Sequence, residues 1–272
     1  MIEYLYLGRV DYADALRLQH ELVELRHTGQ VDNVLLLLEH PPVLTLGRNA
    51  RRSNILATDE ALARNGITVH ENNRGGDVTY HGPGQLVGYP IFDLRTLTNA
   101  KGNRLGPVDF VRQMEEALIR LCLGYGVRTA RIPGRTGVWT SPTPIDPVSP
   151  EKKIAAIGVH VSRGITSHGF ALNVSTDLRE FQWIVPCGIA DREVTSLQRE
   201  MPHPQNPNGL PTLEQAANAA ARSFGHVFGQ HVLALDSLDA LHSGIRQVGV
   251  PLRIPKEVER LHHGPASETE LS

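Results

Sequence analysis

The sequence has 272 residues, of which 40% are hydrophobic and 21% are charged, a composition typical of a folded globular protein. The formal net charge is −2, so no overall positive field is present to attract nucleic acid or an anionic membrane. The longest apolar run, residues 34–38, is too short to cross a bilayer, and the first residues do not resemble an export signal. We therefore expect a cytoplasmic protein with no nucleic-acid or membrane partner, and with two reduced cysteines.

The first half of the chain alternates between strand and helix patterns. Residues 2–7 predict a short strand, and apolar residues at helical spacing predict a helix from Asp11, its N-cap, to about residue 28. Residues 34–40 predict a buried strand that ends at Pro41. Further strands are expected near residues 69 and 88.

The second half predicts two helices and a hairpin. Pro107 opens a helix whose apolar stripe includes Cys122. Residues 153–162 and 167–174 predict two strands joined by a turn at Gly164, and a last helix follows near residues 212–228. The pattern favours an α+β fold, a mixed sheet with packed helices, in one domain over residues 1–235. Residues 141–150 contain four prolines and predict an exposed loop, and residues 236–272 predict a C-terminal extension with a disordered end.

The densest functional signal is a glycine-rich segment. Residues 74–89 contain five glycines and one proline, and glycine is kept where the backbone bends sharply or approaches a ligand. Arg74, Thr79, His81 and Gln85 lie among them as polar groups able to contact such a ligand. A hairpin of tight turns explains the same residues equally well. Neither phosphate-binding glycine pattern is present.

Cys187 is the stronger candidate of the two cysteines for a nucleophile. A proline precedes it and a glycine follows it, which places the thiol on a turn, whereas Cys122 lies in the apolar stripe of a helix. A thiol needs a nearby cation to be mostly thiolate at neutral pH, and Lys153 and His81 are the candidates. By itself, a lysine at the start of a strand is more often a solvated edge residue. No spacing predicts a metal site, and no cofactor is expected.

Together these segments resemble the octanoyltransferases of lipoate biosynthesis, the lipoyl(octanoyl) transferase family. Every position of that family's motif is filled, by Arg74, Gly75, Gly76, Thr79, Tyr80, His81, Gly84, Gln85 and Tyr89. Residues 153–158, 168–174 and 186–189 also match the family in order and approximate spacing. The resemblance spans roughly residues 34–197.

The resemblance implies the fold of the biotin and lipoate protein ligase catalytic domains, in which a mixed sheet cups an acyl chain. It implies a thioester on Cys187 and a Lys153 that lowers the pKa of that thiol. His81 is the third expected catalytic residue, to orient the carbonyl or relay a proton. The residues expected to bind the substrate are Arg74, Gly75, Gly76, Asp77, Val78, Thr79, Tyr80, His81, Ala156, Ile157, Gly158, Gly169, Phe170 and Ala171.

The resemblance also implies the reaction and its partners. An octanoyl group passes from octanoyl–acyl carrier protein to a lysine of a lipoyl domain. The acceptors are the E2 subunits of 2-oxoacid dehydrogenases and the H protein of glycine cleavage. Three alternatives stay open: an ATP-dependent lipoate or biotin ligase on the same fold, a hydrolase that uses Cys187 with His81, and a non-catalytic binding module.

Overall fold

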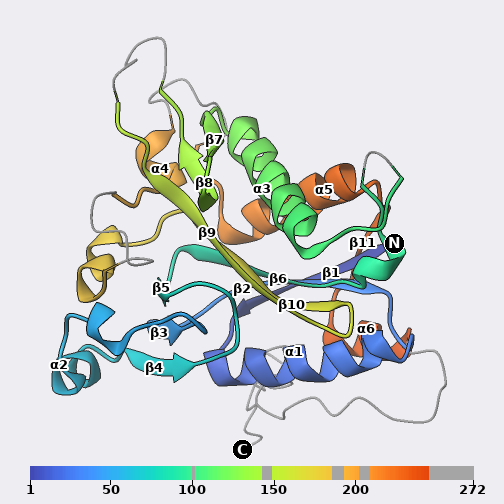
Figure 1. The fold of residues 1–272 in the computed structure, drawn as a ribbon, viewed down its shortest axis with the longest axis horizontal. Coiled ribbons are helices and arrows are strands. Elements are labelled where there is room, and N and C mark those ends of the chain that lie inside the picture. Colours follow the sequence, from blue (N-terminus) through green and yellow to red (C-terminus); the bar gives the residue numbers. More distant parts are fainter. Residues whose placement is uncertain (100–101, 143–148, 186–192, 202–208, 245–272) are drawn as a thin grey trace, which may run out of the picture.

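A mixed eight-stranded sheet runs through the molecule, with helices on both of its faces (Figure 1). The computed structural model describes residues 1–99, 102–142, 149–185, 193–201 and 209–244. Strand β1 pairs in parallel with β2 and with β11, and the other neighbours are antiparallel. In spatial order the strands are β11 (Val232–Ala234), β1 (Ile2–Arg9), β2 (Asn33–Glu39), β6 (Gln85–Ile91), β10 (Ile165–Asn173), β9 (Lys153–Ser162), β8 (Arg135–Thr140) and β7 (Thr129–Ile132).

Each face of this sheet is covered by a pair of helices. On one face α3 (Pro107–Gly124) and α5 (Leu213–Phe228) enclose a core in which Phe92, Phe110 and Phe224 are fully buried. On the other face α1 (Tyr12–His27) and α6 (Leu238–Ser243) pack over β1, β2 and β6. Along the described parts of the chain, no helix is both long and apolar enough to span a membrane.

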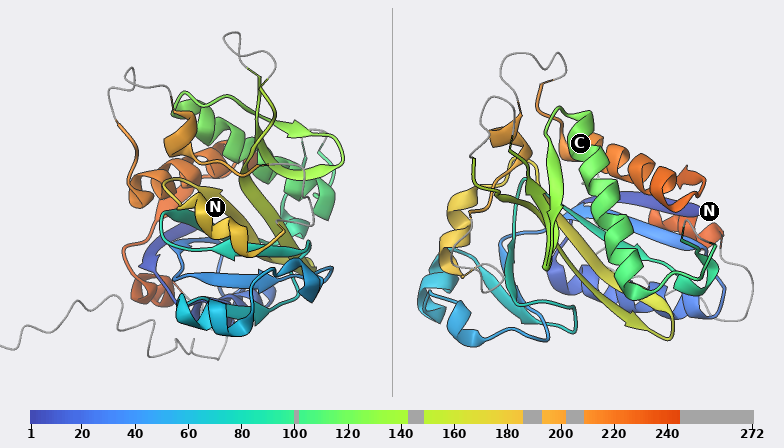
Figure 2. Two further views of the ribbon diagram at one scale, coloured as in Figure 1. Left: turned by 90° about the vertical axis from the view of Figure 1, so that its left-hand side faces the viewer. Right: turned by 45° about the horizontal axis from the view of Figure 1, so that its top comes forward.

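A second sheet lies at one end of the first (Figures 1 and 2). Its order is β4 (Thr68–Glu71), β3 (Val43–Leu46) and β5 (Val78–His81), and it is accompanied by the short helix α2 (Asp59–Arg64). Its own small core includes Leu44, Leu62 and Tyr80. The remaining elements are short: η1 (Arg52–Asn54), η2 (Leu94–Thr96), η3 (Leu178–Trp183) and α4 (Leu197–Glu200).

Local chemistry explains the helix ends that the sequence predicts. The side chain of Asp11 accepts a hydrogen bond from the backbone N–H of Ala13 at 2.9 Å and so caps α1. Pro107 occupies the first turn of α3, where its missing N–H costs no hydrogen bond. Thr212 and Gln215 form a reciprocal capping box at the start of α5.

The predicted α+β class, mixed sheet and packed helices are confirmed. Cys122 is fully buried in α3, and burial raises the pKa of its thiol to about 12, so it is the inert cysteine that the sequence predicts. The sequence-based predictions did not include β3, β7, β8, β11, α2 or α6, nor β5 inside the glycine-rich segment.

Two predictions about domain boundaries are not tested. Residues 143–148, most of the proline-rich segment, lie outside the described residues, as do residues 245–272. The division at residue 235 stays a prediction. In the described part of the extension, Leu238 and Leu241 of α6 are buried in the same cluster as Leu18 and Leu22 of α1.

Candidate active site

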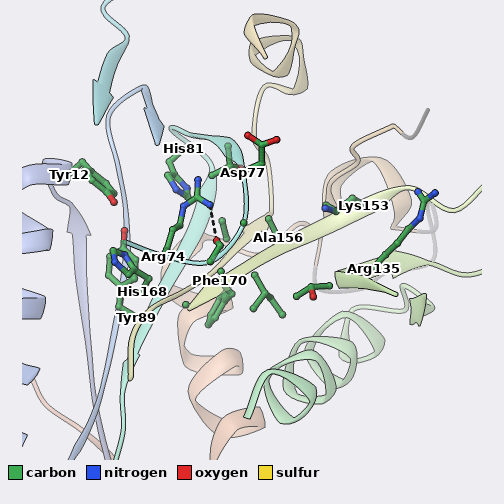
Figure 3. Close-up of a pocket in the computed structure, with 18 of the residues that line it drawn as sticks. Tyr12, Arg74, Asp77, His81, Tyr89, Arg135, Lys153, Ala156, His168 and Phe170 are labelled. Carbon is green, nitrogen blue, oxygen red and sulfur yellow. Dashed lines mark hydrogen bonds between the residues drawn. The ribbon is translucent and has the colours of Figure 1, made fainter. Parts of the chain in front are cut away.

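A cavity of about 210 Å³ lies where the glycine-rich segment meets β9 and β10 (Figure 3). It brings together twelve of the fourteen residues expected to bind substrate, all except Val78 and Tyr80, and it also includes Lys153. Three segments far apart in the sequence therefore share one wall. The lining residues that the sequence predicts are Arg74, Gly75, Gly76, Asp77, Thr79, His81, Lys153, Ala156, Ile157, Gly158, Gly169, Phe170 and Ala171.

The alternation of a β-strand separates the residues of β5. Thr79 and His81 line the cavity, whereas Val78 and Tyr80 are buried in the core of the small sheet. The ring of Tyr80 packs against Phe181, with the two centroids 5.6 Å apart. The predicted substrate-binding roles of Val78 and Tyr80 stay predictions.

Glycines let the loop before β5 lie directly on β9. The N–H of Gly75 donates to the carbonyl oxygen of Val159 at 2.9 Å. A Cβ on Gly158 would lie only 2.5 Å from the carbonyl oxygen of Gly75, so a side chain at 158 cannot be accommodated without moving the loop. This close contact between backbones forms one wall of the cavity.

Arg74 is buried in this wall, and its guanidinium makes hydrogen bonds within it. It donates to the carbonyl oxygen of Thr45 at 2.6 Å, to the hydroxyl of Thr45 at 3.0 Å and to the carbonyl oxygen of Gly75 at 3.1 Å. These bonds tie the glycine-rich loop to β3. The positive charge of Arg74 also contributes to the low pKa values of His81 and His168.

The surrounding hydrogen bonds show which ring nitrogen of His81 carries the proton. The amide nitrogen of Gln85 donates to the carbonyl oxygen of Tyr80 at 3.2 Å and to the side-chain oxygen of Asn173 at 3.0 Å. The amide nitrogen of Asn173 in turn donates to the carbonyl oxygen of Thr195 at 2.9 Å, which fixes the orientation of both amides. The side-chain oxygen of Gln85 therefore accepts from Nδ1 of His81 at 2.8 Å.

His81 consequently presents Nε2 as a hydrogen-bond acceptor. Burial, together with the neighbouring His40, lowers the pKa of His81 to about 3, so the ring is neutral at physiological pH. The hydroxyl of Thr45 lies 3.4 Å from Nε2. A neutral imidazole of this kind can accept a hydrogen bond from a substrate, but its low pKa makes it a weak base, and it carries no acidic proton to donate.

Tyr12, Tyr89 and His168 also line the cavity, and the sequence reasoning did not assign them to the site. The hydroxyl of Tyr89 donates to Nε2 of His40 at 2.7 Å, because Nδ1 of His40 donates to the carbonyl oxygen of Val10. Tyr89 belongs to the octanoyltransferase motif described above, so that motif could have assigned it to the site. Tyr12 comes from the first turn of α1, about 60 residues upstream of the glycine-rich segment, and no local pattern points to it.

His168 adopts a left-handed backbone conformation, with φ of 56°, in the middle of β10. Its Nε2 lies 2.8 Å from the side-chain oxygen of Asn73 and donates to it. Burial, followed by the charge of Arg74, lowers the pKa of His168 to about 3. A left-handed conformation is uncommon for a residue with a side chain, and here it occurs where β10 borders the cavity.

Lys153 lies at the opposite end of the cavity from Tyr12 and Tyr89 (Figure 3). It is 8% exposed, and its ammonium lies 4.7 Å from the centre of the Trp139 ring, in the geometry of a cation–π interaction. This burial differs from the solvated edge position that a lysine at the start of a strand more often has. Its catalytic role stays a prediction.

Cys187 lies outside the described residues, which omit 186–192. The described chain on either side is well anchored. Upstream, the N–H of Val185 donates to the carbonyl oxygen of Asn54 at 2.8 Å. Downstream, the carbonyl oxygen of Glu193 accepts from the backbone N–H of Lys153, and the N–H of Thr195 donates to the carbonyl oxygen of Lys153, both at 2.9 Å.

A buried carboxylate supports the strand that carries Trp139. Glu115 of α3 is fully buried and pairs with Arg112 at 2.7 Å and with Arg131 at 3.1 Å. Its other oxygen accepts from the backbone N–H of Gly137 at 3.1 Å. Gly137 has φ of 123°, where a side chain would be strained, so this contact holds β8 in a conformation that favours glycine.

Known proteins are similar to this chain in sequence and in fold. The lipoyl protein ligase A/B catalytic domain family matches residues 11–225. A protein of Acidobacterium capsulatum named octanoyltransferase is 60% identical over 238 residues, which are 87% of this chain and 94% of that protein. The chain belongs to the lipoyl protein ligase A/B catalytic domain family. A second octanoyltransferase, from Koribacter versatilis, is 50% identical over 96% of this chain and 97% of its own length.

Solved structures of lipoate protein ligases have a similar fold. A bipartite lipoate protein ligase from Thermoplasma acidophilum has a TM-score of 0.64 at 18% identity, with 90% of each chain covered. A lipoate-protein ligase A bound with ATP has a TM-score of 0.60 at 15% identity, with 97% of this chain and 93% of that chain covered. At such identities the likeness shows the fold alone. The resemblance and the class, an acyltransferase enzyme, are confirmed by the family and by the octanoyltransferases of high identity.

Proposed function

We propose that the chain transfers an octanoyl group from octanoyl–acyl carrier protein to a lysine of a lipoyl domain, through a thioester on Cys187. The observation that carries the proposal is the cavity, which joins a mainly apolar wall to the buried ammonium of Lys153. The names of the most similar relatives agree with the octanoyl group. A relative of the same fold was solved as a system with its E2 lipoyl domain, which supports a lipoyl domain as acceptor.

The first step exchanges one thioester for another. The thiolate of Cys187 attacks the carbonyl carbon, a new carbon–sulfur bond forms, and the bond to the carrier's sulfur breaks. The carrier leaves as a thiolate and takes up a proton. In the second step the neutral amine of the acceptor lysine attacks the carbonyl carbon of the acyl-enzyme. An amide forms, the bond from that carbon to the sulfur of Cys187 breaks to release the thiolate, and the proton that the nitrogen loses passes to water. No ATP is consumed, because the incoming thioester is already activated.

Lys153 acts in the proposal as the cation that favours the thiolate of Cys187. A positive charge about 4 Å from a thiolate stabilises it by roughly 4 kcal/mol at an effective dielectric near 20, which is enough to lower a thiol pKa by up to about three units. The neighbours of Cys187 along the chain support this pairing. Val185 bonds to the backbone of Asn54, and Glu193 bonds to the backbone of Lys153 itself.

His81 has fewer possible roles than the sequence alone allowed. Because its Nδ1 donates to Gln85 and the ring is neutral, Nε2 is available as an acceptor in the wall of the cavity. It suits a hydrogen-bond acceptor that orients the attacking lysine amine, rather than an acid that donates to the carbonyl, because a ring with so low a pKa is a weak base. The apolar residues Ala156, Ile157 and Phe170 would surround the acyl tail.

Intact mass measurement tests the proposal. After the protein is mixed with octanoyl–acyl carrier protein, one octanoyl group should be added to the wild type and to Cys122→Ser, and none to Cys187→Ser. The buried Cys122 is the matched control, since burial raises the pKa of its thiol. The group should then move to an added lipoyl domain. An adduct that survives Cys187→Ser, or a reaction that requires octanoate with ATP, would overturn the proposal in favour of a ligase.

The role of Lys153 has its own test. The rate of alkylation of Cys187 by iodoacetamide, followed against pH, gives the pKa of the thiol. Lys153→Ala should raise this pKa by one unit or more, whereas Lys152→Ala, which removes the neighbouring ion pair with Glu200, should not change it. Equal pKa values in the wild type and Lys153→Ala would exclude the role. Release of free octanoate in place of transfer would instead indicate the Cys–His hydrolase.

A further inference from the structure

Phe170 separates the cavity from the main core. Its ring lines the cavity on one side and packs on Phe224 of α5 on the other, with the centroids 5.6 Å apart. Figure 3 shows the ring below Ala156, on the side of the cavity away from Arg74. Phe224 is fully buried and is itself packed against Phe92 and Phe228. The core behind Phe170 is therefore filled, and the cavity is the open side.

Gly88 of β6 provides the space in which the Phe170 ring lies. The two residues are direct partners across the antiparallel β6–β10 pair. A Cβ on Gly88 would lie 2.2 Å and 2.3 Å from two carbons of the ring, far closer than atoms can approach. Any side chain at 88 must displace the ring. Because Phe224 closes the core side, the displaced ring moves into the cavity.

The cavity has a limited volume of about 210 Å³, so the position of its floor affects how long an acyl chain it can hold. Gain or loss of space for one methylene changes binding by about fourfold, so a small movement of the ring changes which chain is preferred.

We propose that Phe170 and Gly88 together determine the length of the acyl chain that the enzyme accepts. Phe170 is the floor of the cavity, and Gly88, which does not line the cavity, keeps the ring of Phe170 out of it. This inference rests on the proposed function, because it requires an acyl group in the cavity. It adds a specificity-determining residue, Gly88, in a strand beneath the site.

Competition between donors tests the inference. Hexanoyl, octanoyl and decanoyl thioesters of acyl carrier protein are mixed in equal amounts with the enzyme, and the adducts are counted by intact mass. Gly88→Ala should lower the ratio of octanoyl to hexanoyl adducts by about fourfold or more. Phe170→Leu, which shortens the floor, should raise the ratio of decanoyl to octanoyl adducts by a similar factor. These ratios do not depend on the fraction of enzyme that is folded.

Matched controls separate specificity from damage to the core. Gly225→Ala introduces an equally crowded Cβ, 2.2 Å from a methyl group of Val232, and Phe110→Leu removes a buried ring of the same core. Neither residue lines the cavity, so both variants should keep the ratios of the wild type. Unchanged ratios in both Gly88→Ala and Phe170→Leu would overturn the inference while the wild-type adduct still supports the proposed function.

A binding measurement keeps the inference testable if no adduct forms. Isothermal titration with hexanoic, octanoic and decanoic acids requires no reaction at Cys187. The same shift towards shorter acids in Gly88→Ala and towards longer acids in Phe170→Leu would support the inference even where the proposed transfer fails. The same order of affinity in all three proteins would reject it.

Discussion

Mildly acidic pH should destabilise this protein, because three histidines are buried in the neutral form. Burial lowers the pKa of His40 to about 4, and of His81 and His168 to about 3, from an ordinary value near 6.5. The unfolded chain therefore binds more protons than the folded one between pH 6.5 and about 4. The stability that these histidines contribute is complete above pH 6.5 and is lost as the pH falls through this window.

The size of the effect follows from these pKa values. A pH of 5 lies about 1.5 units below the pKa of each histidine in the unfolded chain. This difference corresponds to a loss of about 2 kcal/mol of stability per histidine, or about 6 kcal/mol for the three together. Domains are typically stable by about 5–15 kcal/mol, so a loss of this size brings the midpoint of acid unfolding to roughly pH 4–5. Below pH 6 the slope should approach three protons, about 4 kcal/mol per pH unit.

Urea unfolding followed by circular dichroism at a series of pH values measures this slope. His40→Gln should reduce it by about one proton, because Gln cannot be protonated in the unfolded chain. His226→Gln, at an exposed position on α5, is the matched control for the replacement of a histidine. A free energy of unfolding that stays constant between pH 6.5 and 5 would refute the reasoning.

Three further substitutions have defined consequences. Gly158→Ala places a Cβ 2.5 Å from the carbonyl oxygen of Gly75 and must displace that backbone, so the acylation rate should fall at least tenfold and the midpoint of thermal unfolding should also fall. Glu115→Ala removes the acceptor for the buried N–H of Gly137 and should lower the free energy of unfolding in urea by about 2–4 kcal/mol. Asp11→Ala removes the cap of α1 and should cost about 1 kcal/mol in the same assay.

The elements that the sequence predicts are those with strong local signals. Asp11 and Pro107 mark helix starts by side-chain chemistry that acts within one turn, and both helices begin there. Strand β3 gives no such signal, because it is only four residues long and follows two prolines. The β7–β8 hairpin is held by Glu115, which precedes its first strand by 14 residues, a contact that no local pattern reveals.

The residues of the site also fall into two groups, those that a local pattern predicts and those that only the tertiary structure brings together. The wall made by Arg74, Gly158 and Phe170 is found from motif residues. The motif does not reveal that Arg74 bonds to Thr45, because that contact depends on how β3 lies beside β5. Tyr12 enters the cavity only because α1 begins next to the small sheet, where its hydroxyl accepts a hydrogen bond from Asn72 at 2.6 Å. Such residues come from tertiary structure and not from spacing.

The parallel pairing of β1 with β11 has a consequence during synthesis on the ribosome. Ile2, Glu3 and Tyr4 are partners of Val232, Leu233 and Ala234, so one edge of β1 stays without its neighbour until more than 220 further residues are translated. At about 5–20 residues per second this takes roughly 10–45 seconds. During that time β1 can already pair with β2, but its open edge is available to other nascent chains or to chaperones. The sheet can therefore be completed only after all of its other strands have been translated.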